Sequence, residues 1–171
     1  LLGSIYHFSN SHVVYTWKNG KWNQGELVAG TKIEIEIGAT ALHYGQSCFE
    51  GIKAYRMKDN KIRVFRPEIN AERMIQSAKY SAMQAPSVDL FCEAIKRVVT
   101  DNSEYVPPYG TGGTLYIRPF LFGSGPKIGL SPSDEYKFIV LVTPVGEYYK
   151  GGLSGAGKAL IKYNLDRVAP F

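Results

Sequence analysis

The side chains of this chain that could do chemistry include a tyrosine and an arginine on one predicted strand. Side chains two positions apart on a strand share a face, so Tyr116 and Arg118 should point the same way from the strand at 114–122. The alternate positions are apolar, namely Leu115, Ile117 and Leu121. An arginine in such a place needs a polar partner. The partner could be a structural carboxylate such as Glu50, or the carboxylate of a ligand gripped by the guanidinium fork.

Two further candidates lie earlier in the chain. The stretch 41–55, ALHYGQSCFEGIKAY, brings aromatic and charged side chains and two glycines into a turn that enters a strand. An aromatic-anchored loop without a chemical role has the same pattern, so the residues alone leave both readings open. Arg73 lies in the first turns of a predicted helix, where an arginine is usually a solvated surface residue.

Other kinds of site are not expected. His7, His12 and His43 do not have the spacing of metal ligands, so no metal site is predicted. The sequence has no nucleophile elbow and no Walker loop. The Gly-rich run 123–127 follows a strand, but no convincing helix opens after it. We therefore interpret it as a connecting loop rather than a phosphate cradle.

The periodicity of the sequence predicts a single α+β domain that positions these side chains. We expect a mixed or antiparallel sheet with two main helices, 67–83 and 87–101, packed on one face. The predicted strands are 13–17, 33–37, 52–57, 62–65, 114–122 and 138–142.

Single residues refine this prediction. Within 33–37, isoleucines alternate with glutamates, which is typical of a half-buried strand. Pro119 indicates a strand edge or a bulge. The continuous apolar run 138–142 predicts a central strand. Asn19-Gly20 predicts a tight turn, and Ser87 is a suitable N-cap for the second helix.

Composition narrows the class of protein. The 171 residues are 44% hydrophobic and 20% charged, as in an ordinary soluble domain, and no apolar stretch approaches the ~18 residues that span a bilayer. The net charge of +5 comes from scattered residues, so neither a nucleic-acid nor a membrane partner is expected. We interpret the two cysteines, Cys48 and Cys92, as reduced thiols, which favours a cytoplasmic location.

Five segments, taken in order, resemble the signature of the branched-chain aminotransferases, which are fold-type IV pyridoxal phosphate enzymes. They are LHYG at 42–45 with FEGIKAY at 49–55, FRP at 65–67 with Asn70, Arg73 and Met74, YIRP at 116–119, PVGEYYKGG at 144–152, and DRVAP at 166–170. The resemblance covers the chain from about Trp17 to Phe171. Each motif alone is weak, but the set in the family's order is specific.

The resemblance implies a role for individual residues. Arg73 would bind the phosphate of the cofactor, pyridoxal 5'-phosphate, because a guanidinium matches phosphate geometry. Two residues on one loop would reach across a homodimer into the partner's site and complete a pocket for aliphatic side chains. The substrate-binding residues that the resemblance implies are Tyr44, Tyr116, Arg118, Tyr148, Phe8, Leu130 and Ile128, of which the last two lie on that loop.

The resemblance also implies an activity, the transfer of the amino group of leucine, isoleucine or valine to 2-oxoglutarate. Two alternatives stay open. One is a related fold-type IV enzyme, such as a D-amino-acid transaminase or an aminodeoxychorismate lyase. The other is a non-catalytic domain that only dimerises or binds a ligand.

One part of the family pattern is absent from the chain. The family's catalytic lysine lies in a Lys-x-Gly-Gly-Asn-Tyr motif shortly after the equivalent of Ala169-Pro170, and no such motif occurs in this sequence. We therefore expect residues 1–165 to form the smaller N-terminal domain and 166–171 to begin an interdomain segment, without the larger cofactor domain. A chain without that lysine should be inactive, because the lysine holds the cofactor and shuttles the proton.

The last expectation concerns the surroundings of Arg118. Its strand face should line the cleft between the two domains, where an arginine can stay hydrated until the substrate arrives. We therefore expect Arg118 to be partly exposed, or to lean on Tyr44 or Glu50.

Overall fold

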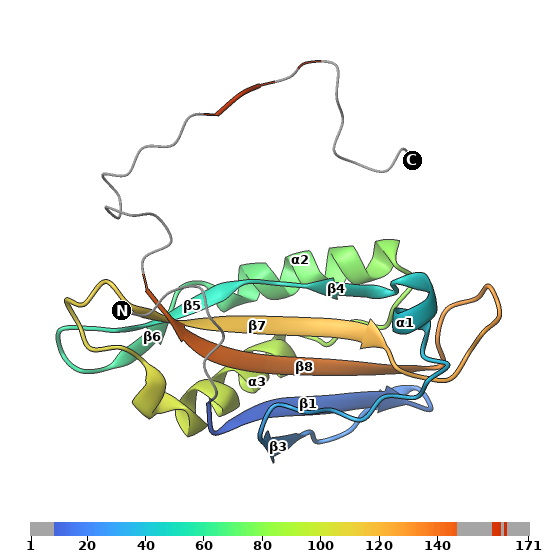
Figure 1. Ribbon diagram of the computed structural model, residues 1–171, viewed down its shortest axis with the longest axis horizontal. Coiled ribbons are helices and arrows are strands. Elements are labelled where there is room, and N and C mark those ends of the chain that lie inside the picture. Colours follow the sequence, from blue (N-terminus) through green and yellow to red (C-terminus); the bar gives the residue numbers. More distant parts are fainter. Residues whose placement is uncertain (1–8, 147–158, 162, 164–171) are drawn as a thin grey trace.

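The centre of the structure, a computed structural model that describes residues 9–146, 159–161 and 163, is one antiparallel sheet (Figure 1). The strand order is β2-β1-β8-β7-β5-β6, with β3 also paired to β1 and β4 also paired to β7. The strands are β1 (Ser11–Lys18), β2 (Lys21–Trp22), β3 (Glu26–Ala29), β4 (Ser47–Phe49), β5 (Ile52–Arg56), β6 (Ile62–Val64), β7 (Thr114–Gly123) and β8 (Glu135–Val145).

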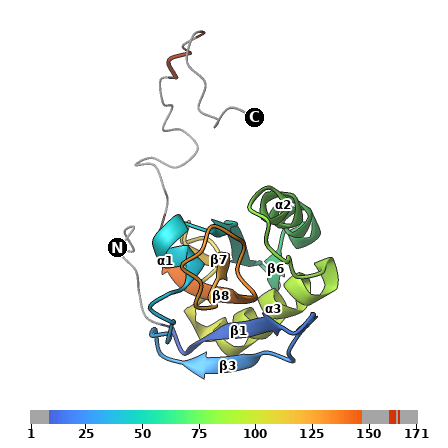
Figure 2. The same cartoon turned by 90° about the vertical axis from the view of Figure 1, so that its right-hand side faces the viewer.

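Two long helices, α2 (Pro67–Tyr80) and α3 (Val88–Asp101), lie on one side of this sheet. Figure 2 shows them on one side of β7 and β8, with the short helix α1 (Thr40–Tyr44) on the other. A single 3₁₀ turn, Ser103–Tyr105, follows α3. The arrangement confirms the predicted α+β architecture. No helix in the described part of the chain is long and apolar enough to cross a membrane.

The core lies between the sheet and the helices, and alternation along β7 and β8 supplies it. Alternate side chains of the two strands belong to the core cluster that also contains buried residues of α2 and α3, and the rings of Phe138 and Phe91 stack with centroids 5.6 Å apart. Burying one such side chain is worth about 1.5–3 kcal/mol, so this layer holds the sheet and the helices together. The fully buried side chains of β7 include Leu115, Ile117 and Leu121, as the sequence predicted.

The predicted turns and caps are confirmed where the backbone itself requires the residue. Asn19 and Gly20 both have positive φ, 53° and 81°, and join β1 to β2. The Ser87 side chain accepts a hydrogen bond from the Leu90 N–H at 3.2 Å and caps α3. The strand β8 is central, between β1 and β7, as the apolar run 138–142 predicted.

The predicted strand at 33–37 is wrong. This segment is an irregular connection between β3 and α1, and Ile37 is 87% exposed. Both edges of β1 are occupied, by β8 on one side and by β3 and β2 on the other, and the segment pairs with none of the described strands, so its alternation does not produce a strand. Helix α2 also stops at Tyr80 rather than at residue 83, since Ala82 takes a positive φ of 49° that a helix cannot contain.

The prediction of a strand edge or bulge at Pro119 is also wrong, because Pro119 lies in the middle of β7 with β8 paired beside it. The other neighbours, β4 and β5, keep one register along β7 but are separated by Glu50 and Gly51. The Glu50 N–H donates to the Pro119 carbonyl at 2.9 Å, and proline has no N–H to return the bond. The proline therefore divides what would be one strand into β4 and β5.

Candidate functional site

The Glu50–Gly51 break between β4 and β5 brings together most of the candidate residues. Because neighbouring residues of an extended chain point to opposite faces, Phe49 and Gly51 face the side of the sheet away from α2, and Glu50 faces α2. Tyr116 and Arg118 lie on the adjacent strand β7, on the same face as Phe49.

The Arg118 guanidinium is held in a fixed position by aromatic side chains. Its Nε donates to the Tyr116 hydroxyl at 3.1 Å, and its central carbon lies 4.2 Å from the centroid of the Phe49 ring. A cation over a ring face is attracted by about 0.5–2 kcal/mol. Arg118 is partly exposed, as expected, and it contacts Tyr116 and Phe49 rather than Tyr44 or Glu50.

Gly51 makes room for the tyrosine. A Cβ placed on Gly51 would lie 2.7 Å from the Tyr116 hydroxyl oxygen, closer than real side chains allow. The glycine therefore lets the hydroxyl approach the backbone and still reach Arg118.

Glu50 is the partner of Arg73, and the suggested pairing of Glu50 with Arg118 is wrong. The buried Glu50 carboxylate accepts hydrogen bonds from the Arg73 Nε at 3.2 Å and from an Arg73 terminal nitrogen, so the pair is bidentate. Asn70 adds a third donor at 2.8 Å. This carboxylate raises the pKa of Arg73, through the hydrogen bond first and the charge second, so the guanidinium stays charged.

One edge of the Arg73 guanidinium is available for an anion. Its side chain is 63% exposed, and within the described residues its second terminal nitrogen donates no hydrogen bond. An exposed, oriented guanidinium edge fits one oxygen of a phosphate group. Arg73 thus suits the phosphate of pyridoxal phosphate as one contact of a larger site.

A second group of candidates gathers at the end of α1. The Tyr44 hydroxyl donates to the backbone carbonyl of Ile128, in the loop 124–134 that joins β7 to β8. Tyr44 and Leu130 of this loop both line a surface cavity of about 390 Å³. Ile128 and Leu130 are 63% and 95% exposed, so their side chains have no cover within the described residues.

The structure does not bring all the predicted residues together. Among the described residues no hydrogen bond joins the Tyr44 group to Arg118 or Arg73. Phe8 and Tyr148 lie outside the described residues. The Gly-rich run 123–127 leads into the loop between β7 and β8 and starts no helix, which agrees with its interpretation as a connection. Within the described part, no group of His, Cys, Asp and Glu could hold a metal.

Sequence reasoning missed the residues that hold the candidates in place. Phe49, Gly51 and Asn70 belong to the motifs, but the sequence assigned no role to any of them. Because side chains alternate along a strand, Phe49 could have been placed on the face opposite to Glu50, where it contacts Arg118. Gln46 was missed as well, and its amide contacts several segments through residues distant in sequence. No local pattern announces such contacts.

The two cysteines are free, as predicted, and neither is an activated nucleophile. Burial and, to a smaller extent, the nearby Glu50 charge together raise the pKa of the Cys48 thiol to about 11. Burial also raises the pKa of Cys92. Because only the thiolate is reactive, both side chains are inert near neutral pH.

Known proteins resemble this chain over nearly its whole length, although no family model matches it. The branched-chain-amino-acid aminotransferase of Haemophilus influenzae is 46% identical over 169 residues, which are 99% of this chain and 49% of that protein. The Helicobacter pylori protein of the same name is 43% identical over 169 residues, 99% of this chain and 50% of that protein. The chain thus spans about half the length of the curated relatives it matches.

Solved structures with a similar fold are also branched-chain aminotransferases. A branched-chain aminotransferase from Thermoproteus uzoniensis, solved with norvaline, has a TM-score of 0.61 and 27% identity, over 81% of this chain and 43% of that chain. A second branched-chain amino acid aminotransferase, complexed with N-(5'-phosphopyridoxyl)-L-glutamate, has a TM-score of 0.59 and 28% identity, over 78% and 40% respectively. The similarity of fold therefore accompanies the similarity of sequence.

Proposed function

Because this chain is a homologue of one half of the branched-chain-amino-acid aminotransferases, we propose that the complete protein is a branched-chain transaminase. It would transfer the amino group of leucine, isoleucine or valine to 2-oxoglutarate, with pyridoxal phosphate as cofactor. In this proposal residues 1–165 are the smaller N-terminal domain, and the segment from 166 leads to a cofactor domain. The protein would act as a cytoplasmic homodimer with small-molecule substrates only.

The observation that carries the proposal is the fixed guanidinium of Arg118. Its Nε is engaged by Tyr116 and its face by Phe49, so the edge that bears the terminal nitrogens is left for a ligand. Amino acids and 2-oxo acids share a carboxylate, which binds such an edge through two parallel hydrogen bonds. Arg118 and Tyr116 would thus orient both substrates by the group they have in common, and a preorganised contact saves binding entropy.

Arg73 would hold the cofactor by its phosphate. When bound, pyridoxal phosphate supplies the electron sink that makes the proton on the substrate's α carbon removable. Glu50 and Asn70 keep the guanidinium in place, and the exposed edge of Arg73 would contact the phosphate. A relative solved with a phosphopyridoxyl adduct supports this assignment of the cofactor.

The substrate side chain would lie against the apolar residues near α1. Tyr44 contacts the loop that carries Ile128 and Leu130, and the exposed side chains of this loop would complete an aliphatic pocket, in the same site or in that of a second copy. Phe8 and Tyr148 would add aromatic walls. The relative solved with norvaline, an unbranched aliphatic amino acid, supports an aliphatic pocket.

A substrate profile of the complete protein tests the proposed function. We expect amino transfer from leucine, isoleucine and valine to 2-oxoglutarate in the presence of pyridoxal phosphate, and no transfer from D-alanine. The present 171 residues lack the Lys-x-Gly-Gly-Asn-Tyr motif, so the same assay on this chain alone should show no turnover. Turnover of D-alanine or of aminodeoxychorismate in place of leucine would overturn the proposed function. Turnover of leucine by the chain alone would overturn only the expectation that these 171 residues are inactive.

A further inference from the structure

The loop 124–134, which carries Ile128 and Leu130, is attached to the neighbourhood of α1 at a few defined points. The Lys127 N–H donates to the Gly38 carbonyl at 2.8 Å, and the Tyr44 hydroxyl donates to the Ile128 carbonyl. Further along the loop, the Ser133 N–H donates to the Gln46 side-chain oxygen at 3.2 Å. The first two attachments lie before the tip of the loop, and the attachment at Ser133 holds the part that returns to β8.

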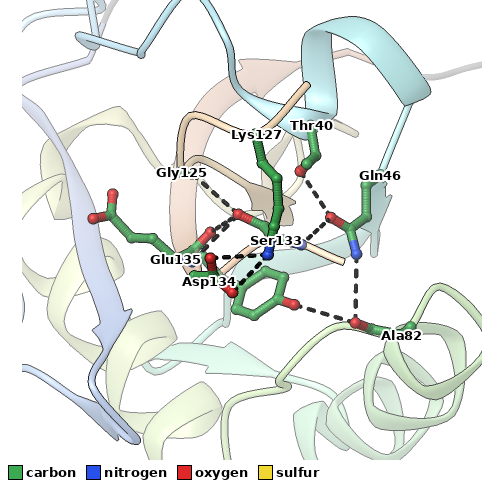
Figure 3. A network of polar contacts seen from close by, with 9 residues as sticks. Thr40, Gln46, Ala82, Gly125, Lys127, Ser133, Asp134 and Glu135 are labelled. Carbon is green, nitrogen blue, oxygen red and sulfur yellow. Dashed lines mark hydrogen bonds and ion pairs between the residues drawn. The ribbon is translucent and has the colours of Figure 1, made fainter. Parts of the chain in front are cut away.

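The Gln46 amide joins several of these segments, and Figure 3 shows its hydrogen bonds with Thr40, Ser133 and the Ala82 carbonyl. Its oxygen accepts from the Thr40 hydroxyl at 2.7 Å and from the Ser133 N–H. Its nitrogen donates to the Ser81 carbonyl at 3.0 Å, just after α2. One side chain thus connects α1, the end of α2 and the loop, and its two ends have separate tasks: the oxygen holds the loop, and the nitrogen holds the turn after α2.

On the side of Gly123 the structure leaves no space for the amide to move, although the Gln46 side chain also lines the surface cavity beside Tyr44 and Leu130. A Cβ on Gly123 would lie 2.6 Å from the Gln46 side-chain oxygen and would clash with the Thr40 hydroxyl. Thr40 and Ser133 are 1% and 5% exposed, so water cannot readily replace their contacts with the amide. Ala82 has a positive φ and forms the turn after α2. The Tyr136 hydroxyl donates to the Ala82 carbonyl at 3.2 Å and so ties this turn to β8.

We propose that Gln46 is a positioning residue that sets the place of the loop 124–134, and through it the aliphatic side of the substrate pocket. The proposal rests on the proposed function for its kinetic consequence, since Ile128 and Leu130 form that side of the pocket there. Gln46 lines the same surface cavity as Tyr44 and Leu130, but the contacts that carry its positioning role are those with Thr40, Ser81 and Ser133. It acts through Ser133 on the loop, and it belongs to the same segment as Tyr44, which holds the Ile128 carbonyl.

Two substitutions separate the ends of the amide. In Gln46→Leu both ends are lost, so the Ser133 N–H and the Ser81 carbonyl each lose a partner. In Gln46→Glu the carboxylate still accepts from Thr40 and Ser133, but its second oxygen faces the Ser81 and Ala82 carbonyls and can donate to neither, so the change disturbs the turn after α2 and keeps the contact with the loop. Gln84→Leu is the matched control, because Gln84 lies on the same turn after α2, is exposed, and donates only weakly to its neighbour Ala85 at 3.4 Å.

Hydrogen exchange by mass spectrometry on the complete protein, without substrate, measures the loop directly. We expect exchange of residues 124–134 to become about tenfold faster in Gln46→Leu, the scale of about 1.4 kcal/mol lost from a buried hydrogen bond. The loop of Gln46→Glu and of the control should exchange as in the wild type. If Gln46→Leu fails to fold, Gln46→Asn, whose amide is withdrawn by one methylene, replaces it with the same expectation for the loop.

Steady-state kinetics supplies the second readout. For Gln46→Leu, or Gln46→Asn in its place, we expect KM for leucine to rise about tenfold, with kcat within about twofold of the wild type, because only the pocket wall moves. An unchanged loop in the substituted protein overturns the proposal, and so does equal loosening in Gln46→Glu or a fall of kcat without a change of KM. A wild-type protein without transaminase activity refutes the proposed function instead, and the exchange experiment still decides the role of Gln46.

Discussion

At the scale of single residues, the geometry shows that the two candidate arginines are held in different ways. Arg118 is fixed by aromatic side chains and keeps its terminal nitrogens for a ligand, whereas Arg73 is fixed by a buried carboxylate. The first can discriminate substrates by their carboxylate, and the second can contribute charge to a cofactor phosphate. Their roles should therefore respond differently to substitution.

Replacing Arg118 by lysine keeps the charge and removes the planar fork. In the complete protein we expect kcat/KM for leucine to fall by a factor that corresponds to about 2–4 kcal/mol, the scale of one preorganised charged contact. Thermal unfolding should change little, because Arg118 is only partly buried. Arg63→Lys, at an exposed ion pair with Asp59, is the control and should leave both measurements unchanged. Loss of stability with normal kinetics would identify Arg118 as a structural arginine.

The thiol of Cys48 gives a prediction about pH. Its pKa of about 11 lies above the ordinary value of 9.0, so the folded protein holds this proton more tightly than the unfolded chain does. The contribution to stability is complete below pH 9 and is lost as the pH rises through about 11. Alkylation of native Cys48 by iodoacetamide should be slow at about pH 8 and should accelerate up to about pH 11, as followed by mass spectrometry.

Fast alkylation of Cys48 near neutral pH would contradict this prediction. Rapid labelling of Cys48 at about pH 7 in the folded protein would mean an exposed or activated thiolate. Protein unfolded in denaturant is the control, in which Cys48 and Cys92 should react alike, because both lose the burial that raises their pKa values.

At the scale of elements, the break between β4 and β5 determines the site. A single proline on β7 leaves Glu50 and Gly51 without regular pairing, and these two residues then serve opposite faces of the sheet. Glu50 reaches Arg73 on α2, and Gly51 admits the Tyr116 hydroxyl. The site therefore depends on where the strand is interrupted as well as on which residues it carries.

Gly51→Ala tests this dependence. The new methyl group would displace the Tyr116 hydroxyl, which then loses its hydrogen bond to Arg118. We expect a destabilisation of about 1–3 kcal/mol, as for overpacking, measured by urea unfolding. Gly129→Ala is the steric control, since nothing lies within 4 Å of a Cβ there, and it should be close to neutral. A Gly51→Ala protein as stable as the control would show that Tyr116 has room to move.

At the scale of the whole molecule, the described part of the chain leaves many large apolar side chains uncovered. They lie on α1, on β4, at the end of α2, in the connections that precede α1 and α2, and on the loop 124–134. Examples that are more than half exposed are Ile37, Leu42, Phe49, Phe65, Tyr80, Ile128 and Leu130. Exposed apolar side chains that lie near one another favour contact with another polypeptide surface.

We therefore expect the 171-residue chain by itself to associate. Sedimentation velocity over a range of about 1–100 μM should show species larger than a monomer, since burial of apolar surface is worth about 25 cal/mol per Å². Leu130→Glu, which places a charge on a 95% exposed position, should shift the distribution toward the monomer without loss of secondary structure by circular dichroism. A single monomeric species across the whole range would contradict the expectation.

The sequence by itself determined the two long helices, the strands β1, β5, β6, β7 and β8, and the order of the motifs, but it did not predict α1, β2, β3 or β4. Local signals are short-range, so the turn at Asn19-Gly20, the cap at Ser87 and the buried alternation of β7 could be predicted and are confirmed. The resemblance likewise named a family, and the relatives bear it out. The prediction of a strand at 33–37 was wrong. An alternating segment becomes a strand only where another strand pairs with it, and that depends on how the rest of the sheet is arranged.

Only the tertiary structure decided which side chains are partners. Glu50 was a candidate partner of Arg118, yet it pairs with Arg73, because alternation along an interrupted strand turns it toward α2. Gln46 gave no signal at all, since its contacts with Ser81 and Ser133 join residues 35 and 87 positions away. Hydrogen bonds between distant segments depend on how the sheet and helices pack, and that packing cannot be read from neighbouring residues.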